Sequence, residues 1–246
     1  MKKHLWILAI LSILLLVGCS KKDDQPTTAS VETTTGIADE FLPLEDIRFH
    51  VETQDVTEPT ETTEPEPVRT LSVIEVAGYT GYFVEDGSDE IVENVACILV
   101  ENTTEEYLDY GLITANFGEK EYTFTVTGLP GGSSAWVLET NRGTADAGDT
   151  YAYVGETISP LRQVVTQDDR VTVELKEGII AVTNVSEKDL PSVRVYYKSL
   201  LDDGVLLGGI TYTVLAEGLK AGESRELTAG HCLPQGSVVV RLDIGE

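Results

Sequence analysis

The chain has 246 residues, and its 42 acidic side chains outnumber its 17 basic ones, giving a formal net charge of −25. This charge argues against nucleic-acid binding, because phosphate contacts require Lys and Arg, and against electrostatic docking on an anionic membrane. With 41% hydrophobic and 24% charged residues, the average composition is that of a globular protein.

The N-terminus has the features of a secretory signal peptide over residues 1–18. Lys2-Lys3 precede an apolar run from Leu5 to Val17, which is too short to span a bilayer as a helix. The run ends in Leu16-Val17-Gly18-Cys19, which resembles the lipobox of bacterial lipoproteins. The resemblance implies cleavage between Gly18 and Cys19, diacylglycerol on the Cys19 sulfur with acyl chains such as palmitate, and a membrane anchor facing outside the cytoplasm. A plain secretion signal is the alternative.

Residues 19–70 are predicted to form an acidic, Thr/Pro-rich disordered stalk. The stretch Val56–Pro67 alternates Thr, Glu and Pro, and such a composition cannot bury a core. One interruption, Phe41–Phe49, is apolar enough to dock on another surface. It is either a chance cluster or a short recognition segment.

From Leu71 onward the sequence predicts an all-β fold. Short β-branched or aromatic runs alternate with turn sequences such as Glu85–Ser88 and Pro130–Ser133. No window of a dozen residues has helical spacing of apolar residues. The expected strands in the first half are Leu71–Val76, Val95–Val100, Tyr122–Val126 and Ala135–Leu138.

The second half repeats the first. Asn102–Leu108 matches Asn184–Leu190 at an offset of 82 residues, and Tyr122 matches Tyr212 at an offset of 90, after a longer hairpin around Asp203-Gly204. Two such copies suggest tandem small β-sandwiches over residues 71–159 and 160–246.

These matches have a mechanical interpretation. Asn102 and Asn184 stand where a strand stops, and Asn side chains close turns by bonding nearby backbone. The dipeptide Asp203-Gly204 is a strong hairpin signal, because both residues tolerate positive φ. Tyr122 and Tyr212 are predicted to occupy equivalent core positions.

The second copy also resembles a known domain type. Its strand Ile180–Asn184, aromatic strand Val193–Tyr197, hairpin Leu201–Gly204 and turn Gly218–Ser224 resemble the small immunoglobulin-like sandwiches of bacterial surface lipoproteins, including FxLYD-type domains. Where that family has Phe-x-Leu-Tyr-Asp, this chain has Val-Arg-Val-Tyr-Tyr. The resemblance implies tandem immunoglobulin-like architecture and no common enzymatic activity.

Catalytic and metal-binding patterns are weak. His231 is followed by Cys232, and neighbours on an extended strand point to opposite faces, so a nucleophile pair is not expected. No Cys or His residues show zinc-site spacing. Asp146–Thr150 and Gln167–Arg170 are the densest acidic segments, and they are predicted to be solvated loops rather than calcium ligands. We therefore expect no cofactor apart from the lipid.

Two other Cys residues remain after lipidation. The repeat places Cys97 and Cys232 in different copies, so we expect two separate thiols rather than the disulfide of one sandwich. A bridge between the copies is the alternative outside the cytoplasm.

These observations predict a lipid-anchored bacterial cell-surface protein that is not an enzyme. Its function would be binding, adhesion or scaffolding toward an envelope protein or glycan, with no nucleic-acid partner. The alternative is a carbohydrate-capture module, and an accessory hydrolase is less favoured. Carbohydrate capture would use exposed aromatic rings of the first copy, for which the candidates are Tyr79, Tyr82, Tyr107, Tyr110 and Trp136.

Overall fold

The computed structural model describes residues 47–50, 69–88, 90–146, 148–233 and 235–245. Among these residues none is helical, which confirms the all-β prediction, and the four strands expected in the first half are present. The predicted signal peptide, Gly18, Cys19 and most of the predicted stalk lie outside the described residues. The exceptions in the stalk are residues 47–50 and 69–70, and Arg48–His50 form a strand rather than a disordered segment.

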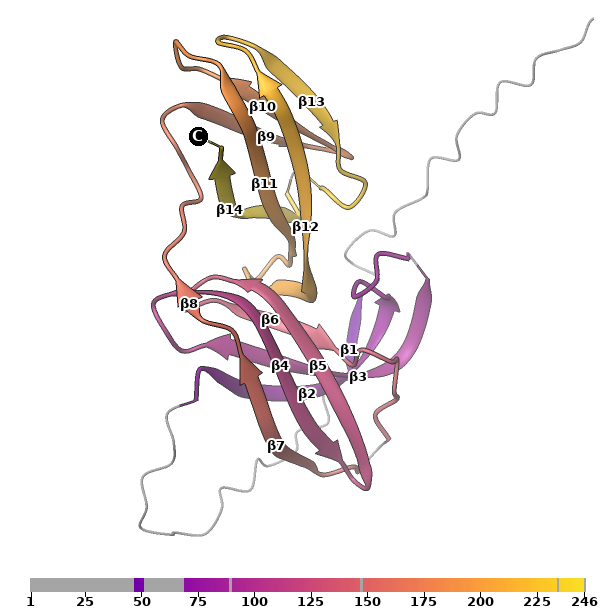
Figure 1. The fold of residues 1–246 in the computed structure, drawn as a ribbon. Coiled ribbons are helices and arrows are strands. Elements are labelled where there is room, and N and C mark those ends of the chain that lie inside the picture. Colours follow the sequence, from indigo (N-terminus) through magenta and orange to yellow (C-terminus); the bar gives the residue numbers. More distant parts are fainter. Residues whose placement is uncertain (1–46, 51–68, 89, 147, 234, 246) are drawn as a thin grey trace, which may run out of the picture. The chain divides into compact units, whose positions relative to one another are not determined.

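The strands are numbered in chain order (Figure 1). They are β1 Arg48–His50, β2 Leu71–Tyr82, β3 Ile91–Asn102, β4 Tyr107–Phe117, β5 Lys120–Leu129, β6 Ser134–Leu138, β7 Tyr151–Ile158, β8 Leu161–Arg162, β9 Val171–Lys176, β10 Ile179–Asn184, β11 Leu190–Leu200, β12 Leu206–Leu219, β13 Ser224–Thr228 and β14 Ser237–Ile244.

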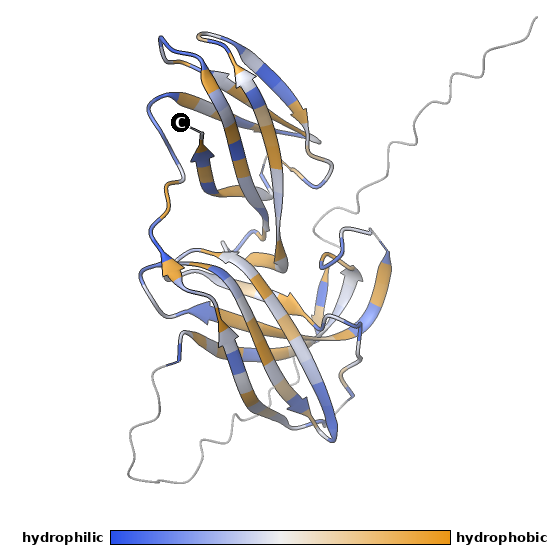
Figure 2. Cartoon of the chain, in the orientation of Figure 1, coloured by the Kyte–Doolittle hydropathy of each residue, from blue (hydrophilic) through white to orange (hydrophobic). Residues whose placement is uncertain are grey.

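The strands form three sheets whose pairing repeats within the chain. The largest has the order β1-β2-β3-β6-β12-β11-β14, and the others are β13-β10-β9 and β5-β4-β7. Thus β2-β3-β6 faces β5-β4-β7 in the first repeat, and β9-β10-β13 faces β12-β11-β14 in the second. Each pair encloses its own apolar cluster. Figure 2 shows the alternation of hydrophobic and hydrophilic residues along β4 and β5 that supplies one side of the first core.

The two copies share one turn in atomic detail. The Asn102 Nδ2 donates to the Glu106 carbonyl at 2.8 Å and to the Leu129 carbonyl at 3.0 Å, and its side chain is fully buried. Asn184 is buried equally, and its Nδ2 donates at 2.8 Å to a carbonyl four residues on and at 3.1 Å to the Leu219 carbonyl. The predicted turn-closing role of both Asn residues is confirmed.

Other features of the predicted repeat also hold. Tyr122 pairs with Ala115 and Tyr212 with Tyr197, which are equivalent registers of β4–β5 and β11–β12, and both Tyr rings pack against their own core. Gly204, at φ 85°, turns the chain between β11 and β12, as the Asp-Gly pair predicts.

Strand β12 joins the two repeats into one sheet. Its first residues Leu206 and Leu207 pair in parallel with Ala135 and Trp136 of β6 on one side, while β12 pairs with β11 on its other side. The predicted boundary near residues 159–160 lies between β7 and β8, and β8 pairs with β4 of the first repeat. All of the described residues belong to one compact unit.

Strand β1 covers the outer edge of β2. Phe49 pairs with Tyr79, and its ring lies 4.5 Å from the Trp136 ring in a stacked arrangement. The Phe41–Phe49 interruption therefore ends in a segment that docks on the chain's own first repeat.

Phe49→Ala should weaken the docking of β1. The half-buried ring supplies most of the apolar contact of this three-residue strand, so we expect a local loss of about 1–2 kcal/mol. Trp136 fluorescence should shift to longer wavelength, and amides along the edge of β2 should exchange faster with solvent. His50→Ala, on the exposed side of β1, is the matched control, and equal spectra for the two variants would contradict the docking role.

Candidate binding site

The aromatic residues proposed for carbohydrate capture divide between core and surface. Tyr79, Tyr107 and Trp136 are buried, with exposed fractions of 0%, 4% and 6%. Buried rings cannot present a flat face to a sugar, so these three do not form an exposed platform. Tyr82 is half-buried and Tyr110 is 39% exposed, and their role in binding stays a prediction.

The buried aromatic residues have structural partners. The Tyr79 hydroxyl donates to the Tyr82 carbonyl at 2.8 Å, and burial raises the pKa of Tyr79 above its ordinary value. Trp136 contacts Phe49, as described above, and Tyr107 lies near the Arg241 guanidinium of β14. These rings stabilise the first repeat and its contact with the second.

Residues His231 and Cys232 do not form a catalytic pair. Cys232 is fully buried in the second core, whereas the His231 ring stacks on Tyr212 with 4.5 Å between ring centroids. Cys97 is buried in a cluster of the first repeat, and both Cys residues are free thiols, as predicted. Burial raises the pKa of each thiol, which leaves little thiolate for chemistry at neutral pH.

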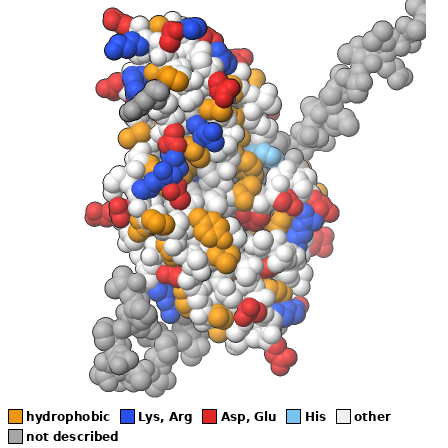
Figure 3. Space-filling view, in the orientation of Figure 1, with side chains coloured by type: hydrophobic (Ala, Val, Ile, Leu, Met, Phe, Trp, Pro, Cys, Tyr) orange, Lys and Arg blue, Asp and Glu red, His pale blue; other side chains and the backbone are white. Residues whose placement is uncertain are grey.

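The acidic segments have partners on the protein. Lys120 forms an ion pair with Asp146 at 2.6 Å, and Arg170 with Asp168 at 2.9 Å. Within the described ranges, no three His, Cys, Asp or Glu residues come together in an arrangement that could hold a metal ion. Figure 3 shows acidic and basic side chains interspersed over the visible face.

Two oppositely charged side chains, the half-buried Glu85 and the fully buried Lys198, lie where the repeats meet. The pairing of β12 with β11 is interrupted by a bulge at residues 208–211 of β12, which lies opposite Lys198 of β11. The Glu85 carboxylate accepts the backbone N–H groups of Leu138 and Gly209, both at 2.8 Å. Lys198 is fully buried, and its Nζ donates to the carbonyls of Thr127, Gly209 and Ile210 at 3.1, 3.1 and 2.6 Å.

The surroundings of Glu85 and Lys198 indicate a role in stabilising the fold. Burial lowers the pKa of Lys198 to about 7 and raises that of Glu85, while the attraction between the two groups opposes both shifts. The backbone of the bulge occupies both charged groups, so neither presents a lone pair or proton to a substrate. Glu85 comes from the first repeat and Lys198 from the second, and the pair therefore fixes the junction.

A second network joins the repeats at the surface. Asp109 of β4 accepts from Arg162 at 2.5 Å and from Arg241 of β14 at 3.1 Å. The Arg241 guanidinium also pairs with Asp243 and lies 4.4 Å from the centre of the Tyr196 ring. Together with Glu85 and Lys198, this network provides polar contacts between the two repeats.

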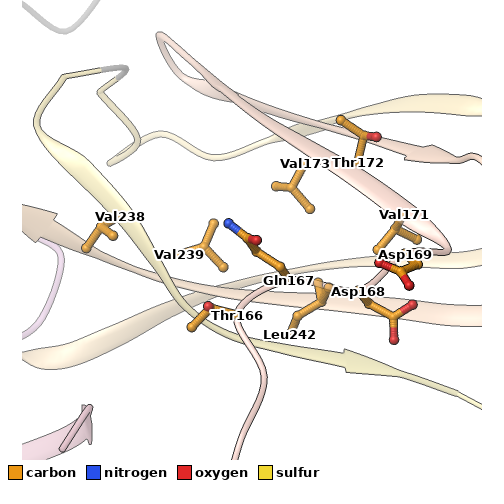
Figure 4. Close-up of a pocket in the computed structure, with 10 residues that line it drawn as sticks. All are labelled: Thr166, Gln167, Asp168, Asp169, Val171, Thr172, Val173, Val238, Val239 and Leu242. Carbon is orange, nitrogen blue, oxygen red and sulfur yellow. The ribbon is translucent and has the colours of Figure 1, made fainter.

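An open groove in the second repeat is a candidate binding feature among the described residues. A cavity of about 590 Å³ opens between β9 and β14, where its two facing sheets part (Figure 4). Its floor is apolar, and its rim is formed by the polar segment from Thr166 to Asp169. In the view of Figure 4 the Gln167 amide lies between Val239 of β14 and Val173 of β9. The apolar floor residues are Val171, Val173, Val238, Val239 and Leu242.

Sequence reasoning missed the groove and the enclosed charges. The sequence predicts only an acidic loop at Gln167–Arg170 and only a turn around Glu85. The volume of the groove lies within the roughly 300–1,000 Å³ of small-ligand sites, and its apolar floor with a polar rim suits an amphipathic group. No hydrolytic constellation accompanies it among the lining residues.

The described residues include no helix long and apolar enough to cross a membrane. The sequence matches no protein-family model and no curated protein.

Proposed function

We propose that this chain is a lipid-anchored bacterial surface protein that binds a partner without catalysing a reaction. The anchoring part rests on the sequence Leu16–Cys19, which resembles a lipobox. Two linked acyl chains would hold the protein stably at a membrane, whereas one would not. The acidic stalk would then separate the β-repeats from the membrane surface.

The two repeats are proposed to be tandem immunoglobulin-like sandwiches. Each has three strands facing three strands and the same Asn-closed turn, which supports that architecture. The resemblance of the second repeat to FxLYD-type domains supports it as well. Domains of this kind present loops and strand edges to partners.

The open groove between β9 and β14 is the observation that carries the binding proposal. It combines an apolar floor with a polar rim, and it lies in a repeat whose buried Lys198 is engaged by backbone carbonyls. Carbohydrate capture is the weaker candidate, because three of the five proposed rings are buried and only Tyr110, at 39% exposure, is exposed.

Cys19→Ala tests the anchoring part of the proposal. The variant lacks the sulfur that would carry diacylglycerol, so it should leave the detergent phase on phase partitioning or accumulate as an unprocessed precursor. Ser20→Ala, the next position, is the control and should partition like the unaltered protein. Equal mass and equal partitioning of Cys19→Ala and the unaltered chain would contradict a lipid anchor.

A further inference from the structure

The internal repeat provides a reference for the open groove. Strand β7 pairs with β4 in the first repeat as β14 pairs with β11 in the second. On β7, Tyr153 pairs with Ala115, whereas on β14 Val239 pairs with Tyr197. Since Ala115 and Tyr197 match at the repeat offset of 82, Tyr153 and Val239 occupy equivalent positions.

The opposite wall of the groove has an equivalent in the same way. Leu71 begins β2 and pairs with Asn102, and Val171 begins β9 and pairs with Asn184. The two Asn residues are the matched turn residues of the repeats. The residue two positions before each strand is Arg69 in the first repeat and Asp169 in the second.

In the first repeat the gap between these strands is closed from within the chain. The Arg69 guanidinium lies 4.0 Å from the centre of the Tyr153 ring, and the Tyr153 side chain packs against the first core. The backbone N–H of Thr70 also donates to Glu156 of β7 at 3.3 Å. An aromatic ring covered by a cation therefore fills this position.

In the second repeat the same two positions hold Val239 and Asp169, and the cavity of about 590 Å³ lies there. Val239 stands where the first repeat has the Tyr153 ring, and the Asp169 anion stands where the first repeat has the Arg69 cation. The groove therefore lacks the two groups that close its counterpart, and its rim charge is complementary to the missing cation.

We propose that the groove binds an extended segment of a partner protein that presents an aromatic side chain beside a basic one. The aromatic ring would displace the exposed Gln167 side chain and enter between the sheets against Val173 and Val239, and the cation would face Asp169 at the rim. This inference rests on the proposed binding function and names the chemistry of its partner.

The strand edges favour a polypeptide as the occupant. Among the described strands β9 is the last of its sheet and β14 the last of the other, and the β14 edge is bridged at Leu242, whose N–H donates to the Val165 carbonyl at 2.7 Å. A strand added at such an edge gains backbone hydrogen bonds and directs alternate side chains to one face. An aromatic residue and a basic residue two positions apart would then both face the groove.

The test is calorimetric titration of the full-length protein, in non-ionic detergent, with the end-blocked pentapeptide Thr-Arg-Thr-Tyr-Thr. We expect saturable binding of one peptide per chain that weakens with added salt. Peptides with Ala in place of Tyr or Glu in place of Arg should bind far less. Asp169→Asn should weaken binding by about two- to fivefold, as expected for an exposed charge pair.

Paired variants give the decisive comparison. Val239→Tyr with Asp169→Arg rebuilds the closing pair of the first repeat and should abolish binding, while the protein keeps its circular dichroism spectrum. Tyr153→Val with Arg69→Asp should open the first repeat and raise the stoichiometry to two peptides per chain.

Several results would overturn the inference. These are no peptide binding at millimolar concentration, equal binding of the Glu-containing peptide, or unchanged binding by the folded Val239→Tyr, Asp169→Arg variant. The proposed function has a separate readout, because anchoring is measured by the partitioning of Cys19→Ala. A failed titration with intact Cys19-dependent anchoring would therefore reject the groove's ligand and leave the surface location standing.

Discussion

Lys198→Met should destabilise the folded protein by about 3–5 kcal/mol, because it removes a fully buried cation that satisfies three carbonyls and attracts the half-buried Glu85 carboxylate. The variant keeps the volume of the side chain but loses three hydrogen bonds to the carbonyls of Thr127, Gly209 and Ile210. It also leaves the enclosed Glu85 carboxylate without its cation. Chemical denaturation at neutral pH measures the loss.

A surface lysine supplies the matched control. Lys176 of β9 pairs with Glu226 at 2.9 Å in a solvent-exposed position. Lys176→Met should therefore leave the free energy of unfolding nearly unchanged. Similar losses for the two Lys→Met variants would contradict the structural role of the buried pair.

A double-mutant cycle separates the pair from its surroundings. Glu85→Gln alone should also destabilise the fold, because its amide would place donor hydrogens against backbone N–H groups. Glu85→Gln combined with Lys198→Met should cost at least about 1 kcal/mol less than the sum of the single changes. Strict additivity would show that the two groups do not interact.

The cost of Lys198→Met should also depend on pH. The folded-state pKa of Glu85 lies above its ordinary value of 4.5, so folding takes up a proton between these two values and stability falls as pH rises through them. Removing the Lys198 cation raises that pKa further. The loss should therefore be largest at neutral pH and should shrink as pH falls toward 4.5.

The strand pattern and the repeat could be predicted because they depend on local sequence. Alternating aromatic and β-branched residues specify strands such as Tyr122–Val126, and an Asn at a strand end specifies a turn partner within four residues. The docking of Phe49 on Trp136 could not be predicted in this way. It depends on a contact between residues far apart in the chain, and a three-residue strand has no measurable periodicity.

The sites depended on information that one sequence does not show. Glu85 stands in a turn-like Glu-Asp-Gly-Ser segment, and its enclosure depends on backbone N–H groups more than 120 residues away. The alternation of apolar and polar residues in Tyr107–Ile113 does not decide whether the Tyr107 or the Tyr110 ring faces the core. The equivalence of Tyr153 and Val239 follows from strand pairing and not from sequence similarity, because the two residues and their flanking sequences are dissimilar.

Asn184→Ala should destabilise the protein by about 2–4 kcal/mol, because it leaves buried backbone groups without partners. The Nδ2 group satisfies the carbonyls of Lys188, Leu219 and Lys220, and the Oδ1 atom accepts from the backbone and hydroxyl of Ser186. Asn102→Ala should have a comparable cost in the first repeat. Since the two turns share no partners, the losses should add to within about 0.5 kcal/mol in the double variant.

Replacement by Asp distinguishes the hydrogen-bond role of Asn184 from its packing. Asn184→Asp keeps the shape but turns an oxygen toward the carbonyls that Nδ2 satisfies, so burial and repulsion should raise the folded-state pKa of the new carboxyl. The unfolded carboxyl titrates near its ordinary pKa, and stability should therefore fall as pH rises above about 4. At pH 7 we expect Asn184→Asp to be less stable than Asn184→Ala. Near pH 4 the protonated carboxyl can donate a hydrogen bond again, so the difference in stability between the two variants should disappear or change sign. Ser186→Ala, which removes only a hydroxyl at the edge of the same turn, should cost about 1 kcal/mol at every pH. A pH-independent loss in Asn184→Asp equal to that of Asn184→Ala would mean that the turn depends on the volume of the side chain rather than on its donor hydrogens.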